Sequence, residues 1–574
     1  MAVAGELQWA RIMTDSLQPD QGGARSRGGT QTWRLSNLVQ ALDEPDSALR
    51  ARAAHRLGFE PGEVRGFRIA KRSVDARRRR ADLRFVCQVD VIVDQGAKRS
   101  RLERLLKNGT VREAPVHGSL EVAALDERRR GARAVVVGAG PAGLLAALVL
   151  ARNGVQVDLI DRGKIVEERS KSLAAFHRRG DLDGDSNLLF GEGGAGTYSD
   201  GKLYTRVNSP LEVPILEELV ACGAQPDILY DSRAHIGTDR LHTVLPRLRA
   251  RMQDAGVRFH YGVRMESLVV EPGPPRRVRA VVTQVGELPC DGLFLALGHS
   301  ARDTWRTLHE QGVAFEQKPF QFGVRVEHPQ DLVTRGRYGE GDPEGLLGPA
   351  SYTLQCRAGD GLPGVHSFCM CPGGKIVASV NEPGYLCTNG MSNSSHSSPF
   401  ANAALVTTVA PEDFAAHGTG PFAGVDYQRH FEARFFEAGG GTYAAPAQRV
   451  PDFLAGRSSS GELKTSYTFG AVPGRIDELL PPGSRDALRR GLERFDQMLP
   501  GFGGSAGVLV GIESRSSGPV RCPRDAGTRA AVGWEDLFPL GEGAGYAGGI
   551  MSAALDGALS AQAWLRGAVA SASR

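Results

Sequence analysis

The sequence predicts an α/β fold with a parallel sheet, interrupted by an inserted α+β domain and preceded by a small α+β domain. A buried strand, a glycine-rich loop and an apolar helix follow one another over residues 134–153. Apolar strands return at 293–297 and 537–540, and the long region between them combines strands with Pro/Gly turns. Because the chain has 574 residues, we expect two or three domains.

The N-terminal part predicts a small domain of its own. Residues 1–30 are polar and end rich in Gly and Ser, which predicts a disordered leader. Residues 33–57 have a helical pattern, with a start signal at Asp46 and a stop at Gly58. Apolar residues alternate over 83–93, and 64–70 is a plausible partner strand. We therefore expect a basic α+β domain at 31–105.

The remaining boundaries follow from the apolar strands. We expect the first part of the dinucleotide-binding domain at 131–298 and its C-terminal return at 511–574. Within these parts, helical patterns occupy 211–222 and 238–255, and a final helix is expected at 549–565. Residues 299–510 would then form an inserted substrate domain.

Charge is uneven along the chain. Residues 51–130 contain 20 Lys and Arg against 11 Asp and Glu, an excess of nine in a chain whose net charge is +4. Runs such as 77–80 and 128–130 are most often solvated surface charge. A surface for a polyanion is the sharper alternative, but no aromatic stacking motif accompanies the runs, so a nucleic-acid partner is not expected.

The eight cysteines are scattered, which predicts reduced thiols in a cytoplasmic protein. Residues 134–151 carry no charge, but Pro141 and three glycines lie among them at the spacing of a strand, a turn and a helix. We therefore expect no membrane span.

The loop after the first strand has the sequence GAGPAG. Gly138 permits the sharp turn, Gly140 lets a pyrophosphate approach the backbone, and Gly143 lets the helix pack closely on the strand. Pro141 and Ala142 open a helix whose free N–H groups and dipole favour phosphate. This pattern predicts a Rossmann-type dinucleotide site.

An acid ends the second strand. Asp161 lies 18 residues beyond Gly143, where a carboxylate accepts the ribose hydroxyls, and we include the adjacent Arg162 in the predicted site. The acid does not distinguish NAD from FAD, because both ligands present the same adenosine ribose.

The C-terminal segment 540–551 distinguishes the two ligands. An apolar strand runs into an acid, then a glycine-rich turn, then a helix. In flavoproteins of the glutathione reductase and hydroxylase type, such a segment places an acid on the ribityl chain and aims a helix N-terminus at the flavin. We therefore predict FAD as the cofactor, bound here by Gly541, Glu542, Gly545, Gly548, Gly549 and Ile550.

A third glycine-rich segment spans 190–206. Its five glycines, hydroxyls and two cations can surround an anionic cofactor with backbone amides, although a flexible surface loop is an equal alternative. The predicted cofactor residues here and at the end of the 293–297 strand are Gly194, Ala195, Gly196, Ser199, Lys202 and Gly298.

These motifs together resemble one bacterial family of predicted FAD-dependent dehydrogenases with a hydroxylase-like flavin fold. The resemblance covers about residues 131–570 and rests on GAGPAG, FGEGGAGTYSDGKLYTR, KPFQFGVRVEHPQ, SFCMCPGG, APAQRV and GEGAGYAGGIMSAALDG in this order. The resemblance implies the fold and FAD as the cofactor, but it does not specify the reaction or the substrate.

Two departures from better-known relatives matter. Aromatic hydroxylases typically read Gly-Asp-Ala at the last motif, with a His and a Pro after it, whereas this chain reads GEG at 541–543 without them. No second strand–GxGxxG–helix unit lies in 299–510, so an NAD(P)H donor would have to bind without a Rossmann domain of its own.

Arg325, His328 and Arg515 are the candidate catalytic residues, because hydride transfer at a flavin needs positioning and at most one acid or base. Arg325 and Glu327 also fit a structural ion pair on alternating strand positions, which we favour, and Glu513 and Arg515 fit a similar pair.

Cys369 and Cys371 flank one residue before a Pro-Gly-Gly turn. No second cysteine pair completes a zinc site, so no metal is expected. Two small residues entering a turn is the favoured interpretation, and a redox pair beside the flavin is the alternative.

The sequence thus predicts an FAD-dependent oxidoreductase that transfers hydride between a small organic substrate and flavin N5. A flavin monooxygenase is one alternative. A non-catalytic flavin-containing RNA-binding or scaffold protein is the other.

Overall fold

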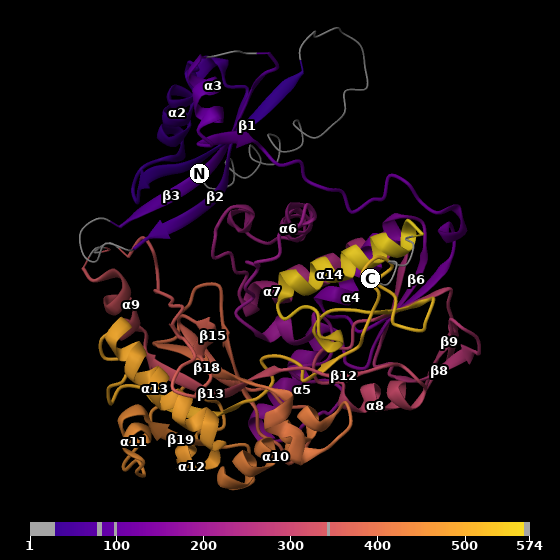
Figure 1. Cartoon of the computed structure of the whole chain (residues 1–574), viewed down its shortest axis with the longest axis vertical. Coiled ribbons are helices and arrows are strands. Elements are labelled where there is room, and N and C mark those ends of the chain that lie inside the picture. Colours follow the sequence, from indigo (N-terminus) through magenta and orange to yellow (C-terminus); the bar gives the residue numbers. More distant parts are fainter. Residues whose placement is uncertain (1–28, 77–82, 97–99, 341, 343–344, 568–574) are drawn as a thin grey trace. The chain divides into compact units, whose positions relative to one another are not determined.

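A computed structural model describes residues 29–76, 83–96, 100–340, 342 and 345–567 (Figure 1). The predicted leader lies outside the described residues except for its last two positions, and the arginine run 77–80 lies outside them entirely. The chain divides into two compact units. One comprises Met1–Leu38, Glu44–Ile69 and Gln88–Ala114, and the other comprises Val39–Asp43, Ala70–Cys87 and Pro115–Arg574.

The N-terminal elements form a four-stranded sheet with two helices. The strand order is β2-β3-β1-β4, which with the helices gives the β-α-β-β-α-β order of a split βαβ arrangement. Asp90 binds Arg34 and Arg68 across three strands of this sheet. The elements are β1 (Thr30–Ala41), α2 (Asp46–Leu57), β2 (Gly66–Asp75), β3 (Arg84–Asp94), α3 (Ser100–Lys107) and β4 (Val111–Glu113).

One prediction in this region is wrong. The first part of the helical pattern 33–57 belongs to strand β1. Pro45 precedes α2 with an extended backbone, and a proline there prevents an upstream helix from continuing. The predicted start at Asp46 and the stop at Gly58, which has a left-handed φ of 86°, are confirmed.

A five-stranded parallel sheet forms the centre of the predicted dinucleotide-binding part. Its order is β23-β11-β5-β6-β7, so the strand before the GAGPAG loop is central. Helix α4 connects β5 to β6, and residues 142–151 of α4 are all buried because the helix packs against this sheet and against α14 (Figure 1). The strands are β5 (Arg133–Val137), β6 (Gln156–Asp161), β7 (Val257–Tyr261), β11 (Gly292–Leu295) and β23 (Leu537–Pro539).

Helices and a small sheet complete this part. An antiparallel sheet of β8 (Met265–Glu271), β9 (Arg277–Thr283) and β10 (Gly286–Pro289) lies between β7 and β11 in sequence. The helices are α4 (Pro141–Arg152), α5 (Val166–Arg179), α6 (Glu212–Ala221), α7 (Thr238–Asp254), α8 (Arg302–Glu310) and α14 (Ile550–Leu565).

A seven-stranded sheet fills the predicted substrate region, with the order β14-β15-β18-β13-β21-β19-β20. The long antiparallel pairing of β13 with β18 is its centre, and α10 and α13 pack against the sheet over a core rich in phenylalanine. The strands are β13 (Phe320–Pro329), β14 (Gln355–Cys356), β15 (Val365–Cys371), β18 (Phe400–Val409), β19 (Ala445–Arg449), β20 (Ala471–Pro473) and β21 (Val508–Glu513).

The remaining elements are short strand pairs and helices of different lengths. They are the strand pairs β12 (Glu316–Gln317) with β22 (Val520–Arg521) and β16 (Gly374–Ala378) with β17 (Thr388–Ser392), and the helices α9 (Gln330–Tyr338), α10 (Ala423–Ala438), α11 (Val450–Ala455), α12 (Ile476–Leu479) and α13 (Pro482–Met498). In the part of the chain that the structure describes, no helix is long and apolar enough to cross a membrane.

Candidate FAD site and the buried charges beside it

The predicted phosphate loop joins β5 to α4. Gly138 has a left-handed φ of 107°, and a Cβ at Gly143 would lie 1.9 Å from the Gly138 carbonyl oxygen. Both positions therefore require glycine for the protein's own backbone. Helix α4 begins with Gly140 as its N-cap and without a side-chain cap, so the N–H groups of its first turn are available to an anion.

Gly140 differs from Gly138 and Gly143, because the protein's own packing does not require a glycine at this position. Its φ of −77° suits any residue, and a Cβ there would meet nothing closer than the Gly194 Cα at 3.9 Å. A Cβ at Gly549, the N-cap of α14, would likewise meet only the Ser552 hydroxyl at 3.5 Å. Glycine at these two positions leaves space over two helix N-termini, as a closely approaching ligand requires, although the Ser552 hydroxyl accepts the Gly549 N–H at 3.0 Å.

The predicted ribose acid is buried against the loop. Asp161 accepts N–H groups from Ala139 at 2.7 Å, Gly163 at 2.8 Å and Gly191 at 3.0 Å. It therefore ties the phosphate loop to the segment that precedes Gly194. Its contact with a ribose remains a prediction. Arg162 instead pairs with Asp303 at 3.0 Å.

The structure brings the three predicted cofactor segments together. A Cβ at Gly194 would lie 3.1 Å from the Gly140 Cα, and a Cβ at Gly196 would lie 3.1 Å from Ile550 and 3.9 Å from Pro141. The 190–206 segment thus lies against the start of α4 and the start of α14 at once. Its interpretation as an unattached surface loop is wrong.

Arg169 on α5 holds this segment in place, and the sequence interpretation missed it. The buried guanidinium donates to the carbonyl oxygens of Asn187 at 2.6 Å, Glu192 at 2.7 Å and Gly194 at 2.8 Å. No motif marks Arg169, since its role depends on a loop that only the folded chain brings to α5.

The C-terminal turn meets the same region. A Cβ at Gly543 would lie 2.4 Å from the Gly298 carbonyl oxygen, so the two predicted cofactor segments touch through their backbones. Glu542 accepts the Gly518 N–H at 2.8 Å, and burial raises the pKa of its carboxyl. Lys318 donates to the Gly518 carbonyl at 3.0 Å. Gly518 therefore links the substrate region to the predicted ribityl acid.

The site combines two helix N-termini, glycines that leave space above them and the acid Glu542. These are features that FAD needs. Which residues hold FAD stays a prediction from the sequence: Gly138, Gly140, Pro141, Ala142, Gly143, Asp161, Arg162, Gly194, Ala195, Gly196, Ser199, Lys202, Gly298, Gly541, Glu542, Gly545, Gly548, Gly549 and Ile550.

Comparison with known proteins agrees with this site. Residues 319–516 match a family described as "FAD-dependent protein, C-terminal domain-like", and residues 132–178 match an FAD binding domain. An uncharacterized protein from Clostridium beijerinckii is 38% identical over 531 residues, which cover 91% of this chain and 97% of that protein. The chain belongs to a family of uncharacterised FAD-dependent proteins. Its cofactor is FAD, and the predicted Rossmann-type α/β fold is confirmed.

Other similarities are more distant. Residues 33–92 match a domain of unknown function. A kynurenine 3-monooxygenase from Salinispora arenicola is 31% identical over 300 residues, which cover 50% of this chain and 57% of that protein. The solved structure of L-proline dehydrogenase from P. horikoshii covers 77% of this chain and 95% of its own at 11% identity, with a TM-score of 0.31, which carries no argument about function.

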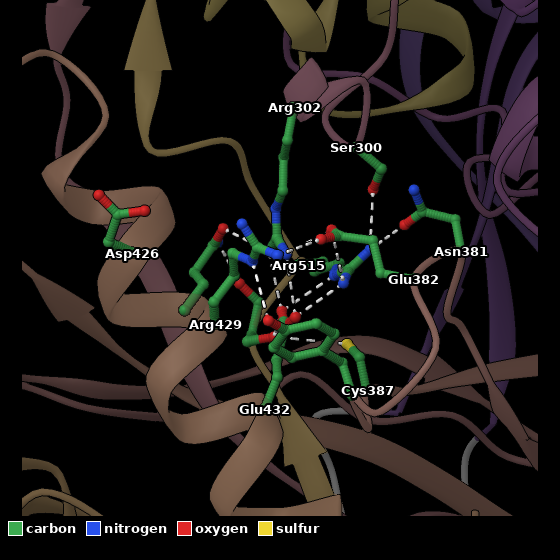
Figure 2. A network of polar contacts seen from close by, with 12 residues as sticks. Ser300, Arg302, Asn381, Glu382, Cys387, Asp426, Arg429, Glu432 and Arg515 are labelled. Atoms are coloured by element: carbon green, nitrogen blue, oxygen red, sulfur yellow. Dashed lines mark hydrogen bonds and ion pairs between the residues drawn. The ribbon is translucent and has the colours of Figure 1, made fainter. Parts of the chain in front are cut away.

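The predicted catalytic arginines occupy two separate buried clusters. Arg515 and Arg302 both bind the Glu432 carboxylate, at 2.7 Å and 3.0 Å (Figure 2). Arg515 also donates to Asn381 at 2.5 Å and to Ser300 at 3.5 Å. Although burial opposes ionisation, the two guanidinium groups lower the pKa of the Glu432 carboxyl well below its ordinary value. The Glu432 carboxylate is therefore ionised near pH 7.

Arg325 lies in the second cluster and is fully buried. It binds Glu513 at 2.8 Å, Asn389 at 3.3 Å and the Cys369 carbonyl at 2.8 Å. The expected pairing of Arg325 with Glu327 is wrong, because β21 lies beside β13 and brings Glu513 closer than a neighbour on the same strand. The expected pair of Glu513 with Arg515 is wrong for the same reason, since each binds a residue of another element.

His328 lies apart from both clusters. Its Nε2 bonds to the Phe502 carbonyl at 2.8 Å, and its ring packs against Phe502 in the core of the seven-stranded sheet. Burial lowers the pKa of His328 to about 4, so the imidazole is neutral near pH 7. Its catalytic role remains a prediction.

His299, which the sequence interpretation passed over, lies closer to the cofactor segments. It follows Gly298 beyond the end of β11, at the edge of a parallel sheet where ligands bind, and this position is the signal that could have identified it. Its Nδ1 lies 2.8 Å from the Ser300 hydroxyl. Burial, with Arg515 and Arg302 nearby, lowers the pKa of His299 to about 4.

Proposed function

We propose that this protein is an FAD-dependent oxidoreductase that transfers hydride between a small organic substrate and flavin N5. The observation that carries the proposal is the meeting of Gly140, Gly196 and Ile550, which come from three distant segments of the chain. Bound FAD supplies an acceptor for a hydride, that is, for two electrons and one proton.

The chain's own residues supply position and charge. The N-terminus of α14 offers unpaired N–H groups and a positive dipole end to negative charge. His299 is neutral near pH 7, so it can donate or accept a hydrogen bond without adding charge. Arg515 is held by Glu432 and Asn381, which suits orientation of a polar substrate group better than proton transfer.

Anaerobic reduction of the bound flavin tests the proposal. The holoprotein is mixed with NADH, NADPH or members of a metabolite panel, and loss of the flavin's visible absorbance is followed. We expect one donor class to reduce it, and Arg515→Lys to slow the reduction because a lysine cannot reproduce the planar contacts of the guanidinium. Reduction by none of these donors would contradict the proposal and favour the scaffold alternative.

A monooxygenase is the second candidate, because half of the chain is similar to a kynurenine 3-monooxygenase. The last motif argues against it, since GEG at 541–543 lacks the His and Pro that follow in aromatic hydroxylases. Oxygen consumption driven by NAD(P)H and coupled to an added substrate would favour this candidate over a dehydrogenase.

A further inference from the structure

Two cysteines occupy an irregular end of strand β15. Phe368 pairs with Ala404 and Cys371 with Asn402, so β15 has one residue more than β18 over this interval. The bulge includes Cys369, whose φ of 42° is left-handed. Residues two apart in a regular strand have Cα atoms about 6.6 Å apart, close to the upper limit of about 6.8 Å for a disulfide.

The two cysteines lie within one bulge and contact each other. The Cys371 thiol donates to the Cys369 carbonyl oxygen at 3.3 Å. Cys369 as a residue is partly exposed and Cys371 is buried. The pair therefore places two thiols side by side in the chain, as reversible disulfide formation requires.

A buried arginine and a partly buried lysine flank the pair. Arg325 Nη2 lies 2.8 Å from the Cys369 carbonyl oxygen and 3.9 Å from the Cys371 Sγ. Lys202 Nζ donates to the Met370 carbonyl at 2.5 Å and pairs with Asp200 at 2.7 Å. Positive charge at this distance favours a thiolate, the form that attacks a disulfide or an electrophile.

The thiol pKa values follow this arrangement. The neighbouring Cys371 thiol, together with Lys202 and Arg325, lowers the pKa of Cys369, and the same coupling raises the pKa of Cys371. By contrast, burial raises the pKa of Cys387 to about 11 and that of Cys290 to about 12. Of the two coupled thiols, Cys369 is therefore the one that ionises first.

The pair is connected to the predicted cofactor region through Lys202. Lys202 belongs to the 190–206 segment, which touches the phosphate loop and α14 through Gly194 and Gly196. On the other side, Arg325 binds Glu513, three residues before Ser516, whose hydroxyl donates to Glu513 at 3.0 Å.

We propose that Cys369 and Cys371 are a redox-active dithiol that exchanges two electrons with the bound FAD by closing to a disulfide. In the oxidation, two sulfurs lose their protons and form one S–S bond. The two electrons pass to oxidised FAD, which takes up two protons and becomes FADH2; the reverse direction reduces the disulfide. The proposal rests on the proposed function and deepens it, because it names a thiol–disulfide couple as electron donor or acceptor.

The oxidised holoprotein tests this without any substrate. The protein is denatured in excess alkylating reagent and digested, and the mass of the peptide that contains residues 369–371 is measured by mass spectrometry. We expect it unalkylated and lighter than the dithiol peptide by two hydrogen atoms, and doubly alkylated after anaerobic reduction of the flavin with dithionite. During that titration the wild type should take up twice as many electrons per FAD as Cys371→Ser or Cys369→Ser.

Cys356→Ser is the matched control, because Cys356 is also partly exposed and lies on the adjacent strand β14. It should behave as the wild type.

Equal electron uptake by the wild type and Cys371→Ser, with both cysteines alkylated in the oxidised protein, would overturn the proposal even where an organic donor reduces the flavin. If the disulfide forms but no organic donor reduces the flavin, the proposed hydride transfer fails and the dithiol stands. The peptide mass is measured on the wild-type protein, so this part of the test does not depend on whether a variant folds.

Discussion

At the scale of single residues, Glu432 shows how a buried charge is retained. One carboxylate accepts Arg302 and Arg515, and all three side chains are nearly inaccessible to solvent. Burying an ion is expensive, and the cost is offset only when partners satisfy it. The arrangement therefore fixes two arginines beside Ser300, which adjoins the cofactor segments.

Replacing Glu432 with Gln should lower the free energy of unfolding by about 3–5 kcal/mol, because two buried cations lose the carboxylate that they share and keep only Glu382. Urea unfolding measures the change. Asp331→Asn is the control, because Asp331 and Arg335 form an exposed ion pair on α9 and should matter little. An equal change in the free energy of unfolding for the two variants would show that the buried cluster stabilises the protein no more than an exposed ion pair does.

The same residue predicts a pH dependence. The folded-state pKa of Glu432 is lowered, so its stabilisation is fully present above the unfolded value of about 4.3 and is lost as the pH falls through the folded value. We expect wild-type stability to fall more steeply below about pH 4 than that of Glu432→Gln. Unfolding midpoints across an acidic pH series measure this, and parallel curves would contradict it.

At the scale of elements, the close contact of α4 and α14 sets the positions of both helix N-termini. A Cβ at Gly557 on α14 would lie 2.0 Å from the Ala142 carbonyl oxygen on α4. The glycine therefore permits the closest approach of the two helices, and it aligns the phosphate loop with the turn at 541–549.

Gly557→Ala should push α14 away from α4, costing about 1–3 kcal/mol of stability and weakening FAD retention. FAD content after gel filtration and thermal unfolding measure the two effects. Gly483→Ala, in the first turn of α13, is the control, because a Cβ there meets nothing within 4 Å and alanine favours helix. Full FAD retention by Gly557→Ala would show that this contact does not set the site.

At the scale of the whole molecule, every predicted FAD residue belongs to the second compact unit. A ligand stabilises only the folded unit that binds it, by about 2.7 kcal/mol at one hundred times its dissociation constant. In scanning calorimetry, added FAD should raise one unfolding transition and leave a second one in place. If the whole heat absorption moves together with FAD, the two units unfold as one.

Local signals predicted much of the site. GAGPAG, the acid at 161 and the 540–551 turn each carry backbone requirements that a sequence displays directly. Polar partnerships could not be predicted in this way: Arg325 and Glu513 are 188 positions apart, and Arg515 and Glu432 are 83 apart. His299 could have been predicted as a site residue, because ligands bind beyond the carboxyl ends of strands in a parallel sheet.

By itself, the sequence determined the cofactor and the fold class, because glycines and strand–helix periodicity reflect backbone geometry within a few turns of chain. Only the tertiary structure decided which charges are paired. It also placed Arg325 and Lys202 beside the cysteine pair at 369 and 371, since ion pairs and thiol reactivity depend on neighbours that folding brings from distant parts of the chain.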